Sequence, residues 1–119
     1  MKEKVLNLLG LATRAGLLVS GEDIVIENMR KKKAKIVFLG SDCSDNTLDK
    51  FKKKCFHYNI ELNTMFTSDE LSHSIGKTRM VLAIIDEGFY KSIKKHLGGV
   101  ENEGKRNNWN SWSRAREIT

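Results

Sequence analysis

An unbroken apolar run, Ile36-Val-Phe-Leu39, constrains the architecture of this chain more than any other feature. Its residues favour strands, and none of them is polar. A strand without polar alternation is buried on both faces, so helices have to cover its sheet from both sides. A second run, Met80-Val-Leu-Ala-Ile-Ile85, is more apolar still. Helical segments alternate with these strands, which predicts an α/β fold: a three-layer α/β/α sandwich around a small sheet.

The segment before Val19 predicts one helix and one short strand. Apolar residues recur at helical spacing and place the end of the helix near Gly16, a glycine suited to the left-handed conformation of a C-cap. Arg14 lies in the last turn of this helix, where a cation complements the helix dipole. Leu17-Leu-Val19 is long enough for a brief strand.

The stretch from Val19 to Gly40 carries the strongest functional signal. Ser20 is predicted to cap a helix, with Asp23 in the reciprocal capping-box position. Gly21 has no side chain, so another molecule can approach the free N–H groups at the helix start, which attract anions together with the helix dipole. An ordinary capped helix with a solvated basic end is the alternative that these residues leave open. Five cations within six residues form that end: Arg30, Lys31, Lys32, Lys33 and Lys35.

The remaining elements follow from helical spacing and capping signals. Thr67-Ser-Asp-Glu70 is a capping box that opens a short helix, and Ile60 to Phe66 alternates weakly, as a third strand would. Gly76-Lys77-Thr78-Arg79 is a polar loop, and Asp86 is predicted to start the last helix. The helix residues predicted to face the core include Ile24, Val25, Met29, Leu48, Phe51, Cys55, Leu71, Ile75, Phe89, Ile93 and Leu97.

Composition is typical of a basic, single-domain globular protein. The 119 residues carry a formal net charge of +6, which favours an acidic partner and nucleic acid above all. No apolar run is long enough for a membrane span, no signal peptide is visible, and the two cysteines are expected to be reduced, so we expect a cytoplasmic protein with no membrane partner. Polar and basic residues dominate after Gly98-Gly99. We therefore expect a folded domain over residues 1–98 and a flexible tail over residues 99–119.

The sequence contains no pattern that predicts catalysis or a cofactor. Neither a phosphate-binding loop with its lysine nor a dinucleotide fingerprint follows a strand. The histidines lie at no metal-ligand spacing to one another or to the cysteines. Carboxylate pairs lie at helix starts, where the helix dipole accounts for them. We therefore predict a protein that is not an enzyme, with no cofactor, no metal and no small-molecule substrate.

Several short motifs gain meaning from their order and spacing. They are Gly10-Leu-Ala-Thr-Arg-Ala-Gly16, Val19-Ser-Gly21, Ala34-Lys-Ile-Val-Phe-Leu39, Ser41-Asp42, Ser74-Ile-Gly76-Lys77 and Ala83-Ile-Ile-Asp86-Glu-Gly88-Phe89. Together they resemble the kink-turn RNA-binding ribosomal protein family, most of all its bacterial YlxQ branch. The resemblance implies a four-stranded mixed sheet between helix layers. It also implies a structured RNA partner with a kink-turn or a similar bend, with ribosomal RNA or the ribosome as the first expectation.

In that family the second helix contacts RNA through an asparagine, a glutamate and a lysine. Aligned from Gly21, this chain has Asp23, Ile24 and Glu27 at those positions. The YlxQ branch also has Gly-Glu-Asp followed by an aliphatic residue, so Glu22 can supply a carboxylate one position earlier. The loop before the last strand is the family's second contact, and here it is charged. The residues that the resemblance assigns to RNA contact are Arg14, Ser20, Gly21, Glu22, Asp23, Glu27, Lys31, Gly76, Lys77, Thr78 and Arg79.

Two functions from different classes remain open at this point. The first is a non-catalytic RNA-binding protein, in which Gly21 to Asp23 meet the bend, Arg14, Lys31 and Lys77 hold phosphates, and Arg79 stacks on a base. The second is a protein–protein adaptor, because sister branches of the same fold bind proteins. The missing Asn-Glu-Lys trio favours the adaptor, and the basic run from Arg30 to Lys35 argues against it.

Overall fold

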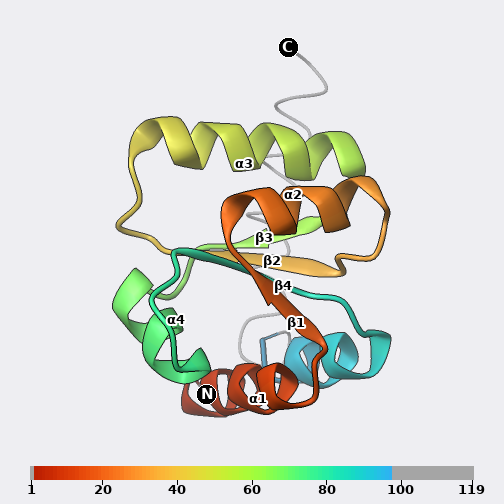
Figure 1. The fold of residues 1–119 in the computed structure, drawn as a ribbon, viewed down its shortest axis with the longest axis vertical. Coiled ribbons are helices and arrows are strands. Elements are labelled where there is room, and N and C mark those ends of the chain that lie inside the picture. The colour runs from red at the N-terminus through yellow and green to blue at the C-terminus, as the bar shows by residue number, and fades with distance from the viewer. Residues whose placement is uncertain (1, 98–119) are drawn as a thin grey trace.

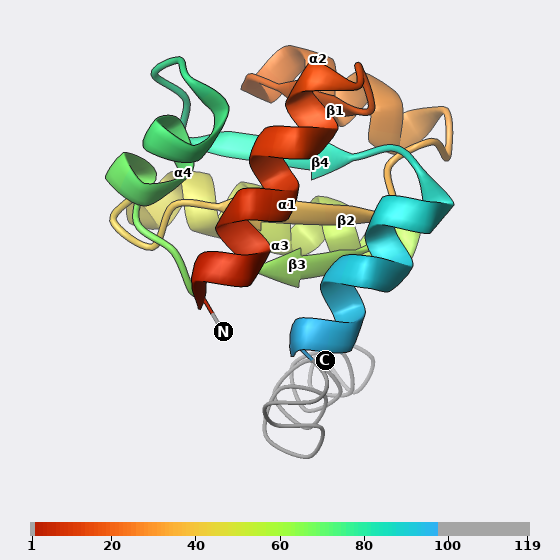
Figure 2. The ribbon, with the colours of Figure 1, turned by 90° about the horizontal axis from the view of Figure 1, so that it is seen from below.

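The computed structural model describes residues 2–97 and shows a sheet held between two layers of helices (Figure 1). In chain order the elements are α1 (Lys2–Arg14), β1 (Leu18–Ser20), α2 (Glu22–Arg30), β2 (Ile36–Leu39), α3 (Asp45–Tyr58), β3 (Glu61–Asn63), α4 (Ser68–Ile75), β4 (Val81–Ile84) and a helix over residues 87–97. The helices α2 and α3 cover one face, and α1, α4 and the helix over 87–97 cover the other (Figure 2). This arrangement confirms the predicted three-layer sandwich. The predicted domain limit at residue 98 and the predicted tail lie outside the described residues.

The sheet is mixed and has four strands in the order β1-β4-β2-β3. β4 pairs antiparallel with both β1 and β2, and β2 pairs parallel with β3. The two apolar runs singled out in the sequence are therefore the two central strands, and all eight of their residues within β2 and β4 are buried. This explains why neither run alternates with polar residues.

The core has two halves, one on each face of the sheet. Ile36 and Phe38 point into the half beneath α1 and α4, whereas Val37 and Leu39 point into the half beneath α2 and α3. Alternate side chains of a strand point to opposite faces, so one apolar strand supplies both halves. Phe38 packs against Phe66 at 6.0 Å between ring centroids, which ties the start of α4 to the sheet.

The predicted capping role of Ser20 is wrong. Ser20 is the last residue of β1 and pairs with Leu82 of β4, so its backbone belongs to the sheet. The N-cap of α2 is Gly21, at φ 96° and ψ 143°, and no side chain caps the helix. A residue with a β-carbon is strained at this φ, and glycine therefore makes the turn from strand to helix.

The predicted burial of Ile24 is also wrong, because 54% of this residue is exposed. Val25 and Met29 are fully buried, and Ile26 packs at the edge of the same core half. The buried stripe of α2 therefore runs on the Val25–Ile26 side rather than the Ile24 side. The turn at Gly21 fixes the rotation of the helix, and the sequence pattern of three neighbouring aliphatic residues does not reveal it.

Most of the other local predictions are confirmed. Gly16 has φ 75° after the end of α1, and Thr67 and Glu70 form the predicted capping box. The Asp86 carboxylate accepts a hydrogen bond from the Phe89 N–H at 2.9 Å at the start of the last described helix. The third strand is shorter than predicted and covers only Glu61–Asn63.

Both cysteines are free thiols, and burial raises the pKa of Cys55 to about 12. Within residues 2–97 no helix combines the length and apolar character that a membrane crossing requires.

Candidate nucleic-acid interface

A hydrogen bond to the sheet fixes the backbone at the start of α2, which we call the α2 opening. The Gly21 N–H donates to the Val81 carbonyl at 3.0 Å, which continues the β1–β4 ladder to the first residue of β4. The Gly21 carbonyl then accepts from the Val25 N–H at 2.9 Å as the first bond of the helix. Within the described residues, the N–H groups of Glu22, Asp23 and Ile24 donate no hydrogen bond. They face outward and can bind a ligand's acceptor atoms.

The two carboxylates at this opening differ in their availability. The Glu22 carboxylate binds Lys50 of α3, with 2.7 Å between Oε1 and Nζ. Asp23 is exposed and has no ion-pair partner in the described part of the chain. Lys50 was not predicted as part of the site, and a separation of 28 residues left no local signal for it. Asp23 is therefore the carboxylate that is free to accept a hydrogen bond from a ligand.

Near the C-terminal end of α2, exposed side chains of opposite charge pair with one another. Glu27 binds the guanidinium of Arg30, three residues on, and its second oxygen lies 3.4 Å from the Lys31 ammonium. All three side chains are largely exposed, so water screens these pairs. The resemblance assigns both Glu27 and Lys31 to RNA contact. Their charges, however, are directed at each other.

The loop from Gly76 to Arg79 is fixed to α4 by one hydroxyl. Gly76 ends α4 at φ 79°, and Ser72 Oγ accepts from the Arg79 N–H and donates to the Arg79 carbonyl, both at 2.9 Å. The Arg79 guanidinium donates to the Thr78 carbonyl at 2.7 Å. The side chains of Lys77 and Thr78 are exposed. The loop is therefore preorganised although its residues lie at the surface.

Strand pairing brings the loop and the α2 opening together. The loop leads directly into β4, whose first residue accepts the hydrogen bond from Gly21. The Met80 carbonyl accepts from the Gly40 N–H at 2.8 Å, so the end of the loop lies between β1 and β2. The predicted residues Ser20, Gly21, Glu22 and Asp23 thus share one surface with Arg79. Glu27 and Lys31 lie farther along α2, and Lys31 is about 12 Å from Asp23 at 1.5 Å per residue.

Arg14 lies on the other side of the loop. Together with Lys77, Thr78 and Gly76 it lines a groove between α1 and α4. The predicted site is therefore divided along the loop: Lys77 lines the groove, whereas Arg79 lies outside the groove lining, two residues before Val81, which binds Gly21.

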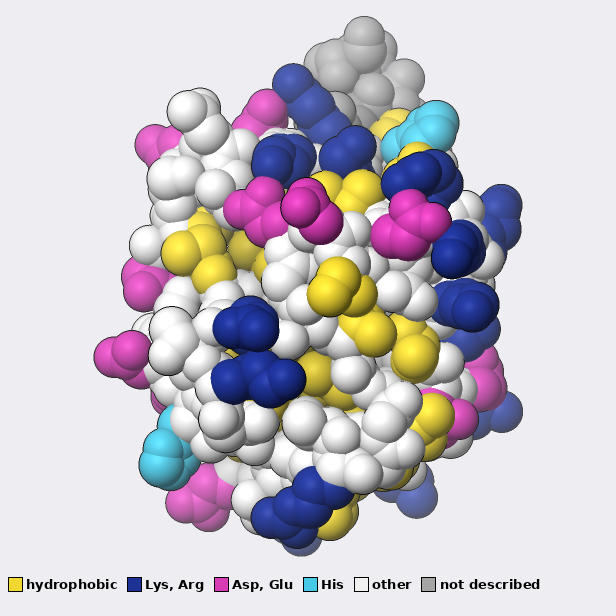
Figure 3. Space-filling model, in the orientation of Figure 1, with side chains coloured by type: hydrophobic (Ala, Val, Ile, Leu, Met, Phe, Trp, Pro, Cys, Tyr) yellow, Lys and Arg dark blue, Asp and Glu magenta, His cyan; other side chains and the backbone are white. Residues whose placement is uncertain are grey.

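Two apolar side chains at the surface were missed in the sequence. Ile24 is 54% exposed beside Asp23, and Met80 is 39% exposed beside Arg79. Figure 3 shows the face with β1 and α2, where apolar side chains form a band below α2, with carboxylates above it and a group of Lys and Arg side chains beside it. Ile24 occupies the position where the family has a glutamate. Because the family has a charged residue at this position, the alignment could have indicated that Ile24 is exposed.

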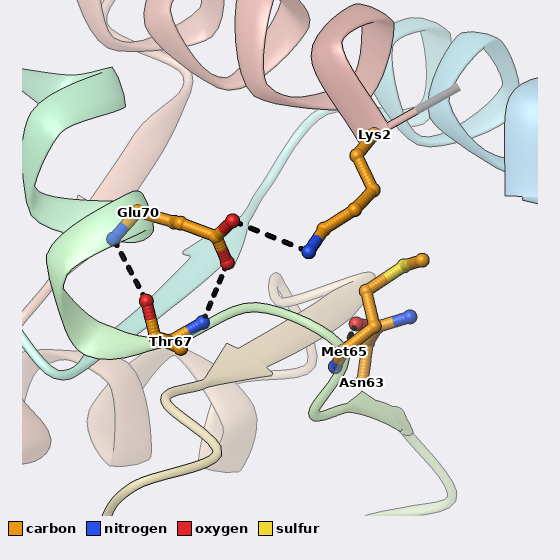
Figure 4. A network of polar contacts seen from close by, with 5 residues as sticks. All are labelled: Lys2, Asn63, Met65, Thr67 and Glu70. Atoms are coloured by element: carbon orange, nitrogen blue, oxygen red, sulfur yellow. Dashed lines mark hydrogen bonds and ion pairs between the residues drawn. The ribbon is translucent and has the colours of Figure 1, made fainter.

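A second polar cluster joins the start of α4 to the start of α1, at the end of these helices away from the loop (Figure 4). The Glu70 carboxylate accepts from the Thr67 N–H at 2.9 Å, and its other oxygen lies 3.2 Å from Lys2 Nζ. The hydrogen bond from the Thr67 backbone, and then the one from Lys2, lower the pKa of Glu70. The backbone N–H of Ser68 likewise lowers the pKa of Asp42. Both carboxylates have structural partners and are not free for a ligand.

The groups at this site are hydrogen-bond donors, a carboxylate and apolar side chains. Among residues 2–97 no three His, Cys, Asp or Glu side chains come close enough to hold a metal ion. The site combines outward amides, one free carboxylate, an ordered arginine and exposed apolar groups.

Comparison with known proteins agrees with this description. The model of the Ribosomal protein L7Ae/L30e/S12e/Gadd45 family matches residues 3–94. A protein of Enterococcus faecium named RNA-binding protein YlxQ is 43% identical over 98 residues, which are 82% of this chain and 95% of that protein. The protein of the same name from Bacillus subtilis (strain 168) is 46% identical over 87 residues, 72% of this chain and 87% of that one.

Solved structures show the same fold. A protein with unknown function from Bacillus halodurans C has a TM-score of 0.72 and 35% identity, and the match covers 76% of this chain and 92% of that one. The 15.5kD RNA binding protein of Giardia lamblia has a TM-score of 0.70 over 85% of this chain and 88% of its own, at 14% identity, which shows a shared fold alone. The family match over residues 3–94 and the relatives at 43% and 46% identity lead to one conclusion: this chain belongs to the Ribosomal protein L7Ae/L30e/S12e/Gadd45 family.

Proposed function

We propose that this chain is a non-catalytic RNA-binding protein that recognises a kink-turn or a similarly bent structured RNA, with ribosomal RNA as the first candidate. One observation carries the proposal: the bond from Gly21 to Val81 places the unsatisfied amides of α2 beside the ordered loop that ends at Arg79. The name RNA-binding protein, which the relatives from Enterococcus faecium and Bacillus subtilis carry, supports it. A cytoplasmic location fits such a partner.

Each group at the opening has a distinct task in this proposal. The amides donate hydrogen bonds to oxygen atoms of the RNA, and Asp23 accepts hydrogen bonds from base N–H groups. Such N–H groups are exposed where sheared G·A pairs distort the helix, and they are inaccessible in a regular A-form groove. Arg79 places its guanidinium plane against a base, and Ile24 and Met80 contact bases through apolar surface. Glu22 orients the opening through Lys50 rather than touching RNA itself.

The test compares two RNAs at one fixed salt concentration. The first is a kink-turn, and the second is the same RNA with its G·A pairs replaced by Watson–Crick pairs. We expect clear preference for the kink-turn, and we expect Asp23→Ala to shrink this preference while binding of the paired RNA stays equal or becomes slightly stronger, because a carboxylate repels a plain phosphate backbone. Asp49→Ala is the matched control, because it removes an exposed carboxylate on α3 and changes the net charge equally. Equal binding of both RNAs by the native protein would refute recognition of the bend.

Salt dependence provides a second measurement. If the site neutralises about three to five phosphates, the slope of log affinity against log salt is about −2 to −5. An affinity for RNA that stays the same from low to moderate salt would contradict the proposal that this chain binds RNA.

The adaptor function remains the second candidate because of one specific feature. The outer surface of α2 presents Ile24, 54% exposed, next to a Glu27–Arg30–Lys31 cluster whose charges are already paired. Such a surface suits a protein partner. Absence of nucleic acid in protein purified at low salt, judged by the ratio of absorbance at 260 and 280 nm, would favour this candidate.

A further inference from the structure

A groove between α1 and α4 begins at the candidate RNA-binding loop and has two electrically opposite ends. Arg14, Lys77 and Thr78 line the end beside the loop, and Glu3 and Asp69 line the far end. The two helices run side by side, and a β-carbon on Gly10 would come within 2.8 Å of the Ser74 carbonyl oxygen. The glycine therefore allows a close approach that leaves a shallow, continuous groove above the contact.

The basic end has the features of an unoccupied binding surface. Arg14 and Lys77 are exposed, and neither has an ion-pair partner within residues 2–97. Leu11 lies between them and the middle of the groove and is 49% exposed, although it is a large aliphatic residue. Apolar surface beside two free cations suits a nucleotide, which combines an aromatic base with a phosphate.

The loop connects this groove to the α2 opening. Lys77 and Thr78 line the groove together with Ser72, whose hydroxyl binds the Arg79 backbone, and the chain then continues to Val81, which accepts from the Gly21 N–H. An RNA strand that leaves the bend at Arg79 passes Lys77 within two residues of the loop. The path from one surface to the other is therefore short and has a cation at each end, Lys77 and Arg79.

The acidic end limits how far a strand can run. Glu70 is paired with Lys2, but Glu3 and Asp69 have no ion-pair partner among the described residues and repel phosphate. The basic part extends from Gly10 to Arg14, four residues of helix or about 6 Å at 1.5 Å per residue. At about 3.4 Å per stacked nucleotide, this length holds about two nucleotides.

We propose that the basic end of the α1–α4 groove binds one or two unpaired nucleotides that extend from the RNA bend, with Leu11 under a base and Arg14 and Lys77 on the phosphates. The inference rests on the proposed function and adds a second subsite to it. The proposed ligand of this groove is RNA and not a protein, because the two unpaired cations lie at the end of the groove that adjoins the candidate RNA-binding loop.

The experiment titrates the full chain with a series of kink-turn RNAs. Their unpaired segment at the bend carries zero, one, two or four extra nucleotides, and a control RNA carries the same two nucleotides at the distal end of its stem. We expect affinity to rise about fivefold to tenfold by the second nucleotide and then to level off. We expect the salt slope to grow by about one, as for one added phosphate contact.

Variants distinguish binding in the groove from a general effect of positive charge on RNA affinity. Leu11→Ser should lose the gain while binding of the RNA without extra nucleotides stays within about twofold, because Leu11 lies outside the α2 opening. Arg14→Ala should lose the gain and the added salt slope. Lys4→Ala is the matched control, since Lys4 is an exposed cation of the same helix that does not line the groove, and it should keep both. Thermal melting confirms that each variant is folded.

The outcomes distinguish the two proposals. Equal affinity for all extension lengths, or a gain that persists in both Leu11→Ser and Arg14→Ala, overturns the groove subsite and leaves recognition of the bend in place. A groove that serves a protein partner predicts this equal affinity. Failure to prefer the kink-turn over its fully paired counterpart overturns the proposed function itself.

Discussion

Glu27 controls how much positive charge α2 offers to RNA. Its two oxygens bind Arg30 and Lys31, so the three side chains together carry a net charge of +1. Glu27→Gln removes the pairing and raises this charge to +2. Glu27→Lys raises it to +3 and places a cation at the position where the family has one.

The expected effect on RNA binding follows from counterion release. Each added charge that meets a phosphate steepens the slope of log affinity against log salt by roughly one unit. We therefore expect a steeper slope by about one unit for Glu27→Gln and by about two for Glu27→Lys. One unit corresponds to a tenfold gain in affinity, or about 1.4 kcal/mol, for each tenfold reduction in salt.

The expected effect on folding is small. The exposed fractions of the side chains are 43% for Glu27 and 57% to 58% for its partners, so solvent screens both pairs. Exposed helix pairs contribute about 0.3 to 0.5 kcal/mol each. Losing both pairs costs at most about 1 kcal/mol, which lowers the melting temperature of a domain of this size by at most about 4 to 8 °C.

The assay measures affinity for the kink-turn RNA at four or more salt concentrations for the native chain and both variants. Asp49→Lys is the matched control, because Asp49 pairs with Lys53 at 3.0 Å in the same way on α3 and the substitution changes the net charge equally. It should leave the slope nearly unchanged. Slopes that stay the same in folded Glu27→Gln and Glu27→Lys would refute contact between this part of α2 and RNA. An equal increase in Asp49→Lys would show that overall charge is responsible.

Three further outcomes test the structure itself. Gly21→Ala should destabilise the fold by about 1 to 3 kcal/mol in chemical denaturation, because alanine is strained at φ 96° even though no atom lies within 4 Å of the added carbon. Hydrogen bonds lower the pKa of Glu70 and of Asp42, so both carboxylates stabilise the fold above the ordinary carboxyl pKa range, and this contribution is lost as the pH falls through their lowered pKa values. In Glu70→Gln, the free energy of unfolding should therefore decrease less as the pH is lowered through the acid range. Cys55, with a pKa of about 12, should resist alkylation at pH 8 in the folded protein, whereas partly exposed Cys43 reacts first, as peptide mapping would show.

Much of the fold is predictable because local chemistry fixes it. The unbroken run Ile36–Leu39 could be stable only in the middle of a covered sheet, and the structure places it there between β4 and β3. The capping box at Thr67 and the glycine at position 16 mark helix ends through backbone geometry that their own neighbours determine. Family membership, too, followed from short motifs in the right order.

The sequence allowed candidate site residues to be named, but it did not reveal which of their charges are paired. Asp23 and Arg79 are exposed, and strand pairing brings their segments together, although more than fifty positions separate them in the chain. The sequence could not show that Glu22 is held by Lys50 or that Glu27 occupies both Arg30 and Lys31. Such pairs depend on side-chain reach across elements, and a list of charges does not contain that information.

The sequence by itself determined the three layers, the end of α1, the start of α4 and the basic character, because each of these depends on the residue types and on their near neighbours along the chain. Only the tertiary structure decided how α2 is rotated. Ser20 belongs to the sheet and Gly21 makes the turn, so Val25 and Ile26 face inward and Ile24 faces solvent. The physical reason is that the hydrogen bond from Gly21 to Val81, between segments sixty residues apart, fixes where the helix begins and which of its faces is buried.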